Sequence, residues 1–281
     1  MPTDPPDNLE VCRIGVTDIS RGMELVSMAG WNQQPRDWEM MLRIGAGYGI
    51  RSRSGRLLAT SVMLPFRPVI GWIGMVLVDE AARRRGLATR LLANAIALAR
   101  TERLVPMLDA TPAGREVYTK LGFAEVVGIT RWRGCGAVEP PRKAMIEDPP
   151  DMTPGHQVDL LAFGGSRAAM LADLAGRLGA LLMRLPDGRG YLWSRAGRTA
   201  TQIGPVLAAK PEDGLALCAA TLDRAAGPVI LDVPDRETGL IEMLAARGFK
   251  PERPFQRMAL GAPHPIALGA GMRVTAGPEL G

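Results

Sequence analysis

The chain has 281 residues, 47% hydrophobic and 22% charged, with a formal net charge of +5 at pH 7. Its length exceeds the ~100 to 200 residues typical of one domain, which favours two domains. It has no run of about 18 apolar residues, no N-terminal secretion signal in "MPTDPPDNLE", and no basic run outside residues 83–85, which argues against a membrane-spanning, secreted or nucleic-acid-binding protein.

The first predicted elements are a hairpin and a buried strand. Residues 47–64, "GYGIRSRSGRLLATSVML", read as two strands that turn at "SRSG". Residues 68–78, "PVIGWIGMVLV", form a nearly unbroken apolar run that opens with a proline and ends before Asp79. Such a run is typical of a strand buried on both faces.

Two helices and two strands follow. Apolar residues recur at helical spacing over residues 87–101, and "VPMLDA" then reads as a short buried strand. Thr111 is the expected N-cap of the second helix, with Pro112 at its first position and Gly122 as its C-terminal cap, before the strand "FAEVVGITRWRG". The order predicts a mixed α/β sheet with a central parallel strand pair.

The loop between the buried strand and the first of these helices is suited to binding an anion. Its sequence, "VDEAARRRGLATRLL", passes through three consecutive arginines and Gly86 into the helix. The first N–H groups of a helix lack internal partners, and the helix dipole places roughly half a positive charge there. Small residues leave these groups accessible to a phosphate, although a solvated basic turn would show the same short pattern.

In this context the segment resembles the GNAT superfamily of acyl-CoA-dependent N-acetyltransferases, over about residues 8–134. The resemblance assigns the CoA pyrophosphate to the R-x-x-G-x-A loop and the pantetheine arm to the strand before it. Thr111 stands where the family often has an asparagine that contacts pantetheine. The implied CoA-binding residues are Val76, Leu77, Val78, Arg83, Arg84, Arg85, Gly86, Leu87, Ala88, Thr89 and Thr111.

Tyr118, four residues before Gly122, matches the tyrosine that faces the CoA sulfur in this family. A phenol with a pKa near 10 can donate a proton to a leaving thiolate, whose pKa is about 8.5. Its alternative role is to pack its ring on the sheet. Residues 1–140 contain no histidine, so the general base is expected to be a carboxylate or a water relay. Asp109 is the candidate carboxylate, or it serves as a turn and cap residue.

The acceptor side of the site is expected near the N-terminus. The segment "AGWNQQPRDWEMML" reads as a loop between helical pieces, and the superfamily places loops of this region along the acceptor pocket. The alternative for both tryptophans is core packing. The candidate substrate-binding residues are Trp31, Asn32, Asp37 and Trp38.

The second part of the chain repeats the first in outline. "IGMVL" at 73 recurs as "IGPVL" at 203, "GLA" at 86 recurs at 214, "LDATP" at 108 is echoed by "LDVPD" at 231, and "GF" at 122 recurs at 248. The order and the nearly constant offset indicate two copies of one fold. The repeat and the closing "GPELG" resemble tandem GNAT proteins. The expected organisation is an acetyltransferase domain at 8–138, a linker at 139–158 and a second GNAT-like domain at 159–281, each with a mixed, mostly antiparallel sheet flanked by helices.

The second copy is expected to be degenerate. Counting back from Gly214 places Pro211, Glu212 and Asp213 opposite the three arginines, in a loop two residues shorter, and Leu244 stands opposite Tyr118. A proline lacks an N–H donor, and carboxylates repel a pyrophosphate. This copy is therefore expected to neither bind CoA nor catalyse, and to shape the acceptor pocket or serve as a purely structural partner.

The resulting prediction is acetyl transfer from acetyl-CoA to a primary amine in a ternary complex, with a non-catalytic CoA-binding or ligand-sensing module as the alternative. Cys12, Cys135 and Cys218 lack metal-ligand spacing and cannot all pair, which favours reduced thiols, no metal and a cytoplasmic location. A small-molecule amine is expected rather than a protein, with no nucleic acid or membrane partner. Polyamine, amino acid, amino sugar, antibiotic and protein N-terminus all stay open as acceptors, as does the oligomeric state.

Overall fold

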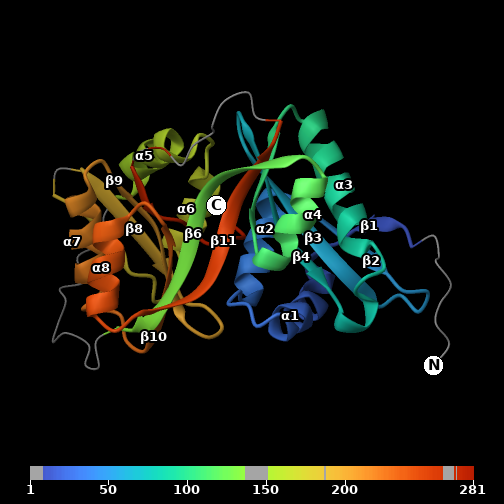
Figure 1. Ribbon diagram of the computed structural model, residues 1–281, viewed down its shortest axis with the longest axis horizontal. Coiled ribbons are helices and arrows are strands. Elements are labelled where there is room, and N and C mark those ends of the chain that lie inside the picture. Colours follow the sequence, from blue (N-terminus) through green and yellow to red (C-terminus); the bar gives the residue numbers. More distant parts are fainter. Residues whose placement is uncertain (1–8, 137–150, 187, 262–268, 270) are drawn as a thin grey trace.

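The computed structural model describes residues 9–136, 151–186, 188–261, 269 and 271–281 (Figure 1). Residue 8 and residues 137–150, which include both ends of the predicted first domain and most of the predicted linker, lie outside these ranges. The last part of that predicted linker, from Thr153, belongs to helix α5. Below, the first half means residues 9–136 and the second half means the described residues from 151 onward.

The first half contains the elements predicted from its sequence. The hairpin turns at residues 52–56, and the Thr111 hydroxyl caps the α4 helix by accepting the Gly114 N–H at 3.3 Å. Gly122 ends that helix in the left-handed region at φ +89°. The elements are β1 (Val11–Arg13), η1 (Val16–Asp18), α1 (Ile19–Met28), α2 (Pro35–Ile44), β2 (Ala46–Arg51), β3 (Leu57–Phe66), β4 (Ile70–Val78), η2 (Glu80–Ala82), α3 (Leu87–Thr101), β5 (Val105–Ala110), α4 (Pro112–Lys120) and β6 (Phe123–Cys135).

The second half repeats this order, as the sequence echoes predicted. The run β9–α7–β10–α8–β11 corresponds to β4–α3–β5–α4–β6, and the strand pairs β4/β5 and β9/β10 are both parallel. The elements are α5 (Thr153–Phe163), α6 (Ala168–Ala175), β7 (Leu182–Arg184), β8 (Gly190–Arg195), β9 (Thr201–Ala208), α7 (Pro211–Leu222), β10 (Pro228–Pro234), α8 (Thr238–Ala246), β11 (Lys250–Leu260) and β12 (Met272–Val274).

The two halves exchange their last long strands and thereby share one 12-stranded sheet, in the order β1-β2-β3-β4-β5-β11-β6-β10-β9-β8-β7, with β12 on β9. β11 lies between β5 and β6, and β6 lies between β11 and β10. In Figure 1 these two strands run side by side through the centre of the molecule. Each half therefore completes its sheet with a strand from the other.

In both halves the two parallel strands separate after a short paired stretch. β4 and β5 pair only from Ile70 to Trp72, and β9 and β10 pair only from Thr201 to Ile203. Beyond these positions, the edge of β4 that faces β5 has no partner strand among the described residues. The corresponding edge of β9 is covered, because β12 pairs antiparallel with it.

The place where two parallel strands separate is called a gap below. The C-terminal segment runs from the gap between β9 and β10, in the second half, to the gap between β4 and β5, in the first half. Thr275 N–H donates to the Asp232 carbonyl of β10 at 2.9 Å, so the segment bridges the parted strands β9 and β10. A Cβ at Gly204 would lie 2.0 Å from the Thr275 carbonyl oxygen. In the first half, a Cβ at Gly74 would lie 3.1 Å from the Glu279 carbonyl oxygen. The echoed "IG" glycines therefore both make room for the C-terminal segment.

The loops that enter the two equivalent helices differ more than the sequence alignment predicted. Helix α3 begins after the loop 79–86, whereas α7 begins at Pro211, immediately after residues 209–210. Pro211 at the first helical position and two acidic residues in the first turn favour this early start. Glu212 and Asp213 are thus helical, and the expectation of a loop merely two residues shorter was wrong. The second half lacks the loop itself.

The interface between the halves is part of the hydrophobic core. Trp38 and Trp72 of the first half and Phe163 and Trp193 of the second half belong to one cluster of buried side chains. The rings of Trp72 and Phe163 are 5.8 Å apart. None of the helices in the described ranges is long and apolar enough to span a membrane.

The exchanged strands predict that the halves cannot be separated. A chain that ends at residue 136 would lose both neighbours of β6, namely β11 and β10, and one neighbour of β5. Unpaired backbone groups and apolar faces on these strands should prevent cooperative folding. Circular dichroism during heating should show no sharp transition for this truncated chain, and a cooperative melt would contradict the strand exchange.

Candidate functional site

A pocket opens where β4 and β5 separate. Residues 73–76 of β4 form one side, and Leu108 and Asp109 of β5 form the other. Thr111 and Tyr118 of helix α4 line the same pocket. The sequence-predicted candidates Val76, Asp109, Thr111 and Tyr118 are therefore brought together here.

The second half and the chain's end complete the pocket. Arg253 and Phe255 of the exchanged strand β11 line it, together with Pro278 and Glu279 near the C-terminus. Arg131 of β6 is a further lining residue. This first-half pocket is therefore built from both copies of the fold.

A bulge shapes the β4 edge at this pocket. The register between β3 and β4 shifts between Thr60 and Val62, and Met75 takes the left-handed φ of +53°. The Thr60 hydroxyl donates to the Met75 carbonyl at 2.9 Å and holds the bulge in place. Bulges of this kind turn backbone groups out of the sheet. The edge from Val76 to Val78 can therefore offer hydrogen bonds to an amide-bearing ligand.

The arginine loop lies at the end of this edge. Residues 83–86 are exposed, and Gly86 is the N-cap of α3 at φ +75°, so no side chain caps the helix. Arg83 pairs with Glu80 at 3.2 Å, whereas no carboxylate in the described ranges pairs with Arg84 or Arg85. Uncapped N–H groups and unpaired cations at a helix start suit a phosphate.

Tyr118 lies on α4, four residues before Gly122, the glycine that ends the helix. Its side chain is half-buried, packs on Phe123 and faces the pocket. Burial raises the pKa of the Tyr118 phenol to about 12. The phenol is therefore protonated at neutral pH and can act as a hydrogen-bond donor or acid.

Asp109 is held in a buried ion pair. Its two carboxylate oxygens accept from Nε and Nη2 of Arg257, both at 2.8 Å, and its side chain is 1% exposed. Burial raises the pKa of Asp109, and Arg257 opposes this rise. The repeat contains the same pair: Asp232 accepts from Nε and Nη2 of Arg131, both at 2.8 Å. Each arginine stands on a strand exchanged from the other half.

This correspondence favours a structural role for Asp109. The second half lacks an arginine loop and a tyrosine at the position of Tyr118, yet it keeps the aspartate and its arginine. A pair retained in the half without the arginine loop and the tyrosine locks the exchanged strand to its neighbour. The geometry therefore favours a structural ion pair over a general base, and among the described residues Thr111 rather than Asp109 makes the cap contact of α4.

We expect Asp109→Asn and Asp232→Asn to destabilise the protein by similar amounts. Each leaves a buried arginine unpaired, which costs about 3 to 5 kcal/mol. The free energy of unfolding from urea titrations measures the loss. A general base would show itself differently: at a temperature where both variants are folded, Asp109→Asn would then lose turnover far more than Asp232→Asn.

The four predicted acceptor-side residues have different positions. Trp31 is half-buried and lines the pocket. Asn32 accepts the N–H groups of Thr199 and Ala200 at 2.9 and 3.1 Å, which joins its loop to the second half. Asp37 and Trp38 lie in helix α2 rather than in the expected loop.

Helix α2 starts early because Pro35 occupies its first turn and Asp37 caps it through the Gln34 N–H at 2.7 Å. The other Asp37 oxygen binds Arg177 at 2.5 Å. Trp38 is 1% exposed, in the core alternative foreseen for the tryptophans. Of the four residues, Trp31 alone lines this pocket.

Sequence reasoning missed several lining residues. Gln33 is 5% exposed, lines the pocket and keeps an Oε1 atom without a hydrogen-bond partner in the described structure. Glu279, Arg253 and Phe255 reach the pocket only through strand exchange and the path of the C-terminal segment. The alternation of apolar and polar residues along the chain indicates neither the strand exchange nor the path of the C-terminal segment.

Two family models match the chain. One, described as the acetyltransferase (GNAT) family, matches residues 24–123, and another, described as an acetyltransferase (GNAT) domain, matches residues 156–267. The chain is 26% identical over 252 residues to the uncharacterized N-acetyltransferase YitH of Bacillus subtilis strain 168, covering 85% of this chain and 87% of YitH.

Solved structures share the fold over nearly the whole length. A proposed acetyltransferase from Pyrococcus horikoshii superposes with a TM-score of 0.81 at 18% identity, covering 97% of this chain and 95% of the other. A tandem GNAT protein of the clavulanic acid biosynthesis pathway superposes with a TM-score of 0.55 at 16% identity, covering 89% and 97%.

Proposed function

Because the chain is an acyltransferase of the GNAT superfamily with two GNAT domains in tandem, we propose that its first half transfers an acetyl group from acetyl-CoA to a primary amine. The amine attacks the thioester directly, within a ternary complex. The observation that carries this proposal is the contrast between the halves. The first half keeps an open strand edge leading to an uncapped helix, and the second half covers its edge with β12.

The residues of the first half fit the parts of acetyl-CoA. The N–H groups of Leu87, Ala88 and Thr89, with Arg84 and Arg85, suit the pyrophosphate. The edge from Val76 to Val78 suits the pantetheine amides, since an extended amide chain can pair with a free strand edge. Thr111 lines the pocket; its hydroxyl oxygen accepts the Gly114 N–H as the α4 cap, and its O–H can still donate to the cofactor.

Tyr118 is the proposed acid for the leaving thiolate. Its pKa of about 12 is above that of a thiol in water, which by itself disfavours proton transfer. Burial also raises a thiol, however, as the pKa of about 12 for Cys218 in this chain illustrates. Burial of a thiolate in the same pocket would raise its pKa in the same direction, which would narrow the difference between the phenol and the thiol.

The pocket favours a small amine over a folded protein as acceptor. Trp31, Phe255 and Pro278 wall it, and the C-terminal segment closes one side. A pocket that combines aromatic and apolar walls with convergent polar groups is typical of small-molecule sites. The free thiols Cys12, Cys135 and Cys218 accord with a reducing, cytoplasmic location.

Thiol release tests the function. The full-length protein is mixed with acetyl-CoA and, separately, spermidine, L-lysine, D-glucosamine, kanamycin and an alanyl peptide, and free CoA is measured with a thiol reagent. An amine-dependent rate supports the transferase. Binding of acetyl-CoA without release for any amine would instead favour a ligand-sensing module.

A further inference from the structure

The chain ends in a tight turn that is fixed from both halves. Within residues 277–281, the N–H groups of Leu280 and Gly281 both donate to the Gly277 carbonyl at 2.9 Å. Arg167, which is 1% exposed, donates Nη1 to the carbonyl of Leu280 at 3.2 Å and also to Gly281. Trp72 of β4 donates its indole N–H to the Pro278 carbonyl at 3.1 Å. The position of this turn is therefore well defined.

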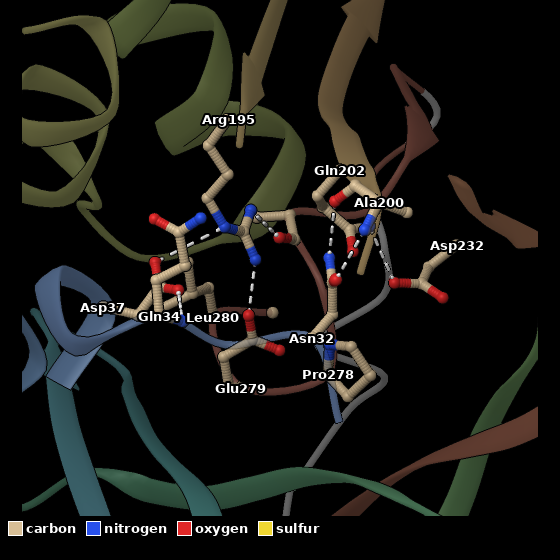
Figure 2. A network of polar contacts seen from close by, with 12 residues as sticks. Asn32, Gln34, Asp37, Arg195, Ala200, Gln202, Asp232, Pro278, Glu279 and Leu280 are labelled. Carbon is tan, nitrogen blue, oxygen red and sulfur yellow. Dashed lines mark hydrogen bonds and ion pairs between the residues drawn. The ribbon is translucent and has the colours of Figure 1, made fainter. Parts of the chain in front are cut away.

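The turn brings Glu279 into the acceptor pocket. Glu279 is 4% exposed, and its backbone rests against Gly74, where a side chain would crowd it. Figure 2 shows Arg195 of β8 reaching its Oε1 atom from the second half. Arg195 also donates to the Ala276 carbonyl at 2.7 Å and so fixes both the carboxylate and its backbone.

Two carboxylates line the pocket, and their oxygens are used differently. Asp109 gives both oxygens to Arg257. Glu279 gives Oε1 to Arg195, its own backbone N–H also hydrogen-bonds the carboxylate, and among the described side chains none besides Arg195 donates to it. Its second oxygen therefore has no side-chain donor and is the better placed to receive a proton from a ligand.

We propose that Glu279 binds the ammonium group of the acceptor and accepts its proton, a role that rests on the proposed acetyl transfer. Glu279 would then be a catalytic residue delivered to the first-half site by the end of the second half. Arg195 is its positioning residue. The second half thus contributes to chemistry although its own CoA gap is closed by β12.

Protons and bonds balance in this scheme. An ammonium acceptor loses two protons as it becomes an amide. The first passes to Glu279 and then to solvent, which frees the nitrogen lone pair. The C–N bond forms and the C–S bond breaks, while the thiolate takes the Tyr118 proton. The second nitrogen proton restores the Tyr118 phenol.

The charges around Glu279 set its pH range. Burial raises its pKa and Asp37 raises it further, whereas Arg195, the Glu279 backbone N–H and Arg131 lower it. Since the base form is needed, kcat should fall with acidification at a pH above that of an ordinary glutamate. The charged or titratable groups that act on it or share its pocket come from six elements: Asp37 of α2, Asp109 of β5, Tyr118 of α4, Arg131 of β6, Arg195 of β8 and Arg253 of β11.

Glu279→Gln tests the role, because glutamine keeps the shape and loses the proton acceptor. With the best amine of the panel, kcat at neutral pH should fall by about 10²-fold or more, and its acidic limb should disappear. Glu279→Asp should regain part of kcat. The rise in melting temperature caused by acetyl-CoA should be unchanged. Glu242→Gln, the same substitution at an exposed position of α8, is the control and should match wild type.

Two results would overturn the role of Glu279 alone: a Gln variant with wild-type kcat and pH profile, or one whose loss of activity follows lost stability and acetyl-CoA binding while the pH profile persists. Either leaves acetyl transfer itself intact. Wild-type protein that releases no thiol with any amine would reject the proposed function and this role together.

Discussion

Gly86→Glu is expected to weaken acetyl-CoA binding by at least about 100-fold, or about 2.7 kcal/mol. Gly86 caps α3 at φ +75°, with no atom within 4 Å of an added Cβ, so the new side chain points into free space at the helix start. Its negative charge would oppose the pyrophosphate and its bulk would cover the N–H groups. The increase in melting temperature produced by acetyl-CoA should vanish.

Gly55→Glu provides a matched control. Gly55 also has a left-handed φ, +83°, and open space around its Cβ position, but it lies in the β2–β3 turn. Both variants carry the same backbone strain, about 1 to 2 kcal/mol. A thermal shift that persists in Gly86→Glu, or that disappears equally in Gly55→Glu, would show that the arginine loop does not hold the cofactor.

Tyr118→Phe is expected to lower kcat by about 10² to 10⁴-fold, the usual contribution of a general acid. The ring would keep its packing on Phe123, so the fold and acetyl-CoA affinity should change little. Steady-state kinetics with saturating amine separates kcat from KM. Tyr48→Phe, another half-buried tyrosine, on β2, is the control.

Full activity of Tyr118→Phe at neutral pH would make Tyr118 a packing residue. The thiolate would then leave without a protein acid. A loss of acetyl-CoA binding in the same variant would point to a structural contribution of the hydroxyl instead.

Local signals predicted much of the fold. The apolar run of β4, the periodicity of α3 and the Thr111–Pro112 cap are decided by neighbours within a few residues. The repeat added the architecture of the second half, since echoed segments occupy equivalent elements. These features place the arginine loop before α3 and Tyr118 within α4, where the structure has them.

The strand exchange could not be predicted in this way. The alternation of side chains along β6 is compatible with a neighbouring strand from either half. Which strand pairs with β6 depends on the path of the whole chain. Two paired cues were nevertheless present: Arg131 and Arg257 each follow the echoed "GF" glycine by nine residues, and each binds the echoed aspartate of the other half. The position of Glu279 follows from the same topology.

Strand β12 gives a second physical reason, besides the missing loop, to expect that the second half does not bind CoA. Arg273 of β12 donates to the carbonyls of Ala208 and Ala209 at 3.0 and 2.7 Å and pairs with Glu237 at 3.0 Å. These contacts occupy the end of β9, where the first half leaves its strand free. Acetyl-CoA would have to displace a buried ion pair and strand β12 to bind there.

Calorimetric titration of the full-length protein with acetyl-CoA tests most directly whether the first half alone binds the cofactor. One open gap and one closed gap predict a stoichiometry of one acetyl-CoA per chain, with no binding to Gly86→Glu. Two equivalents per chain, or a single equivalent that survives in Gly86→Glu, would contradict the assignment of the cofactor to the first half.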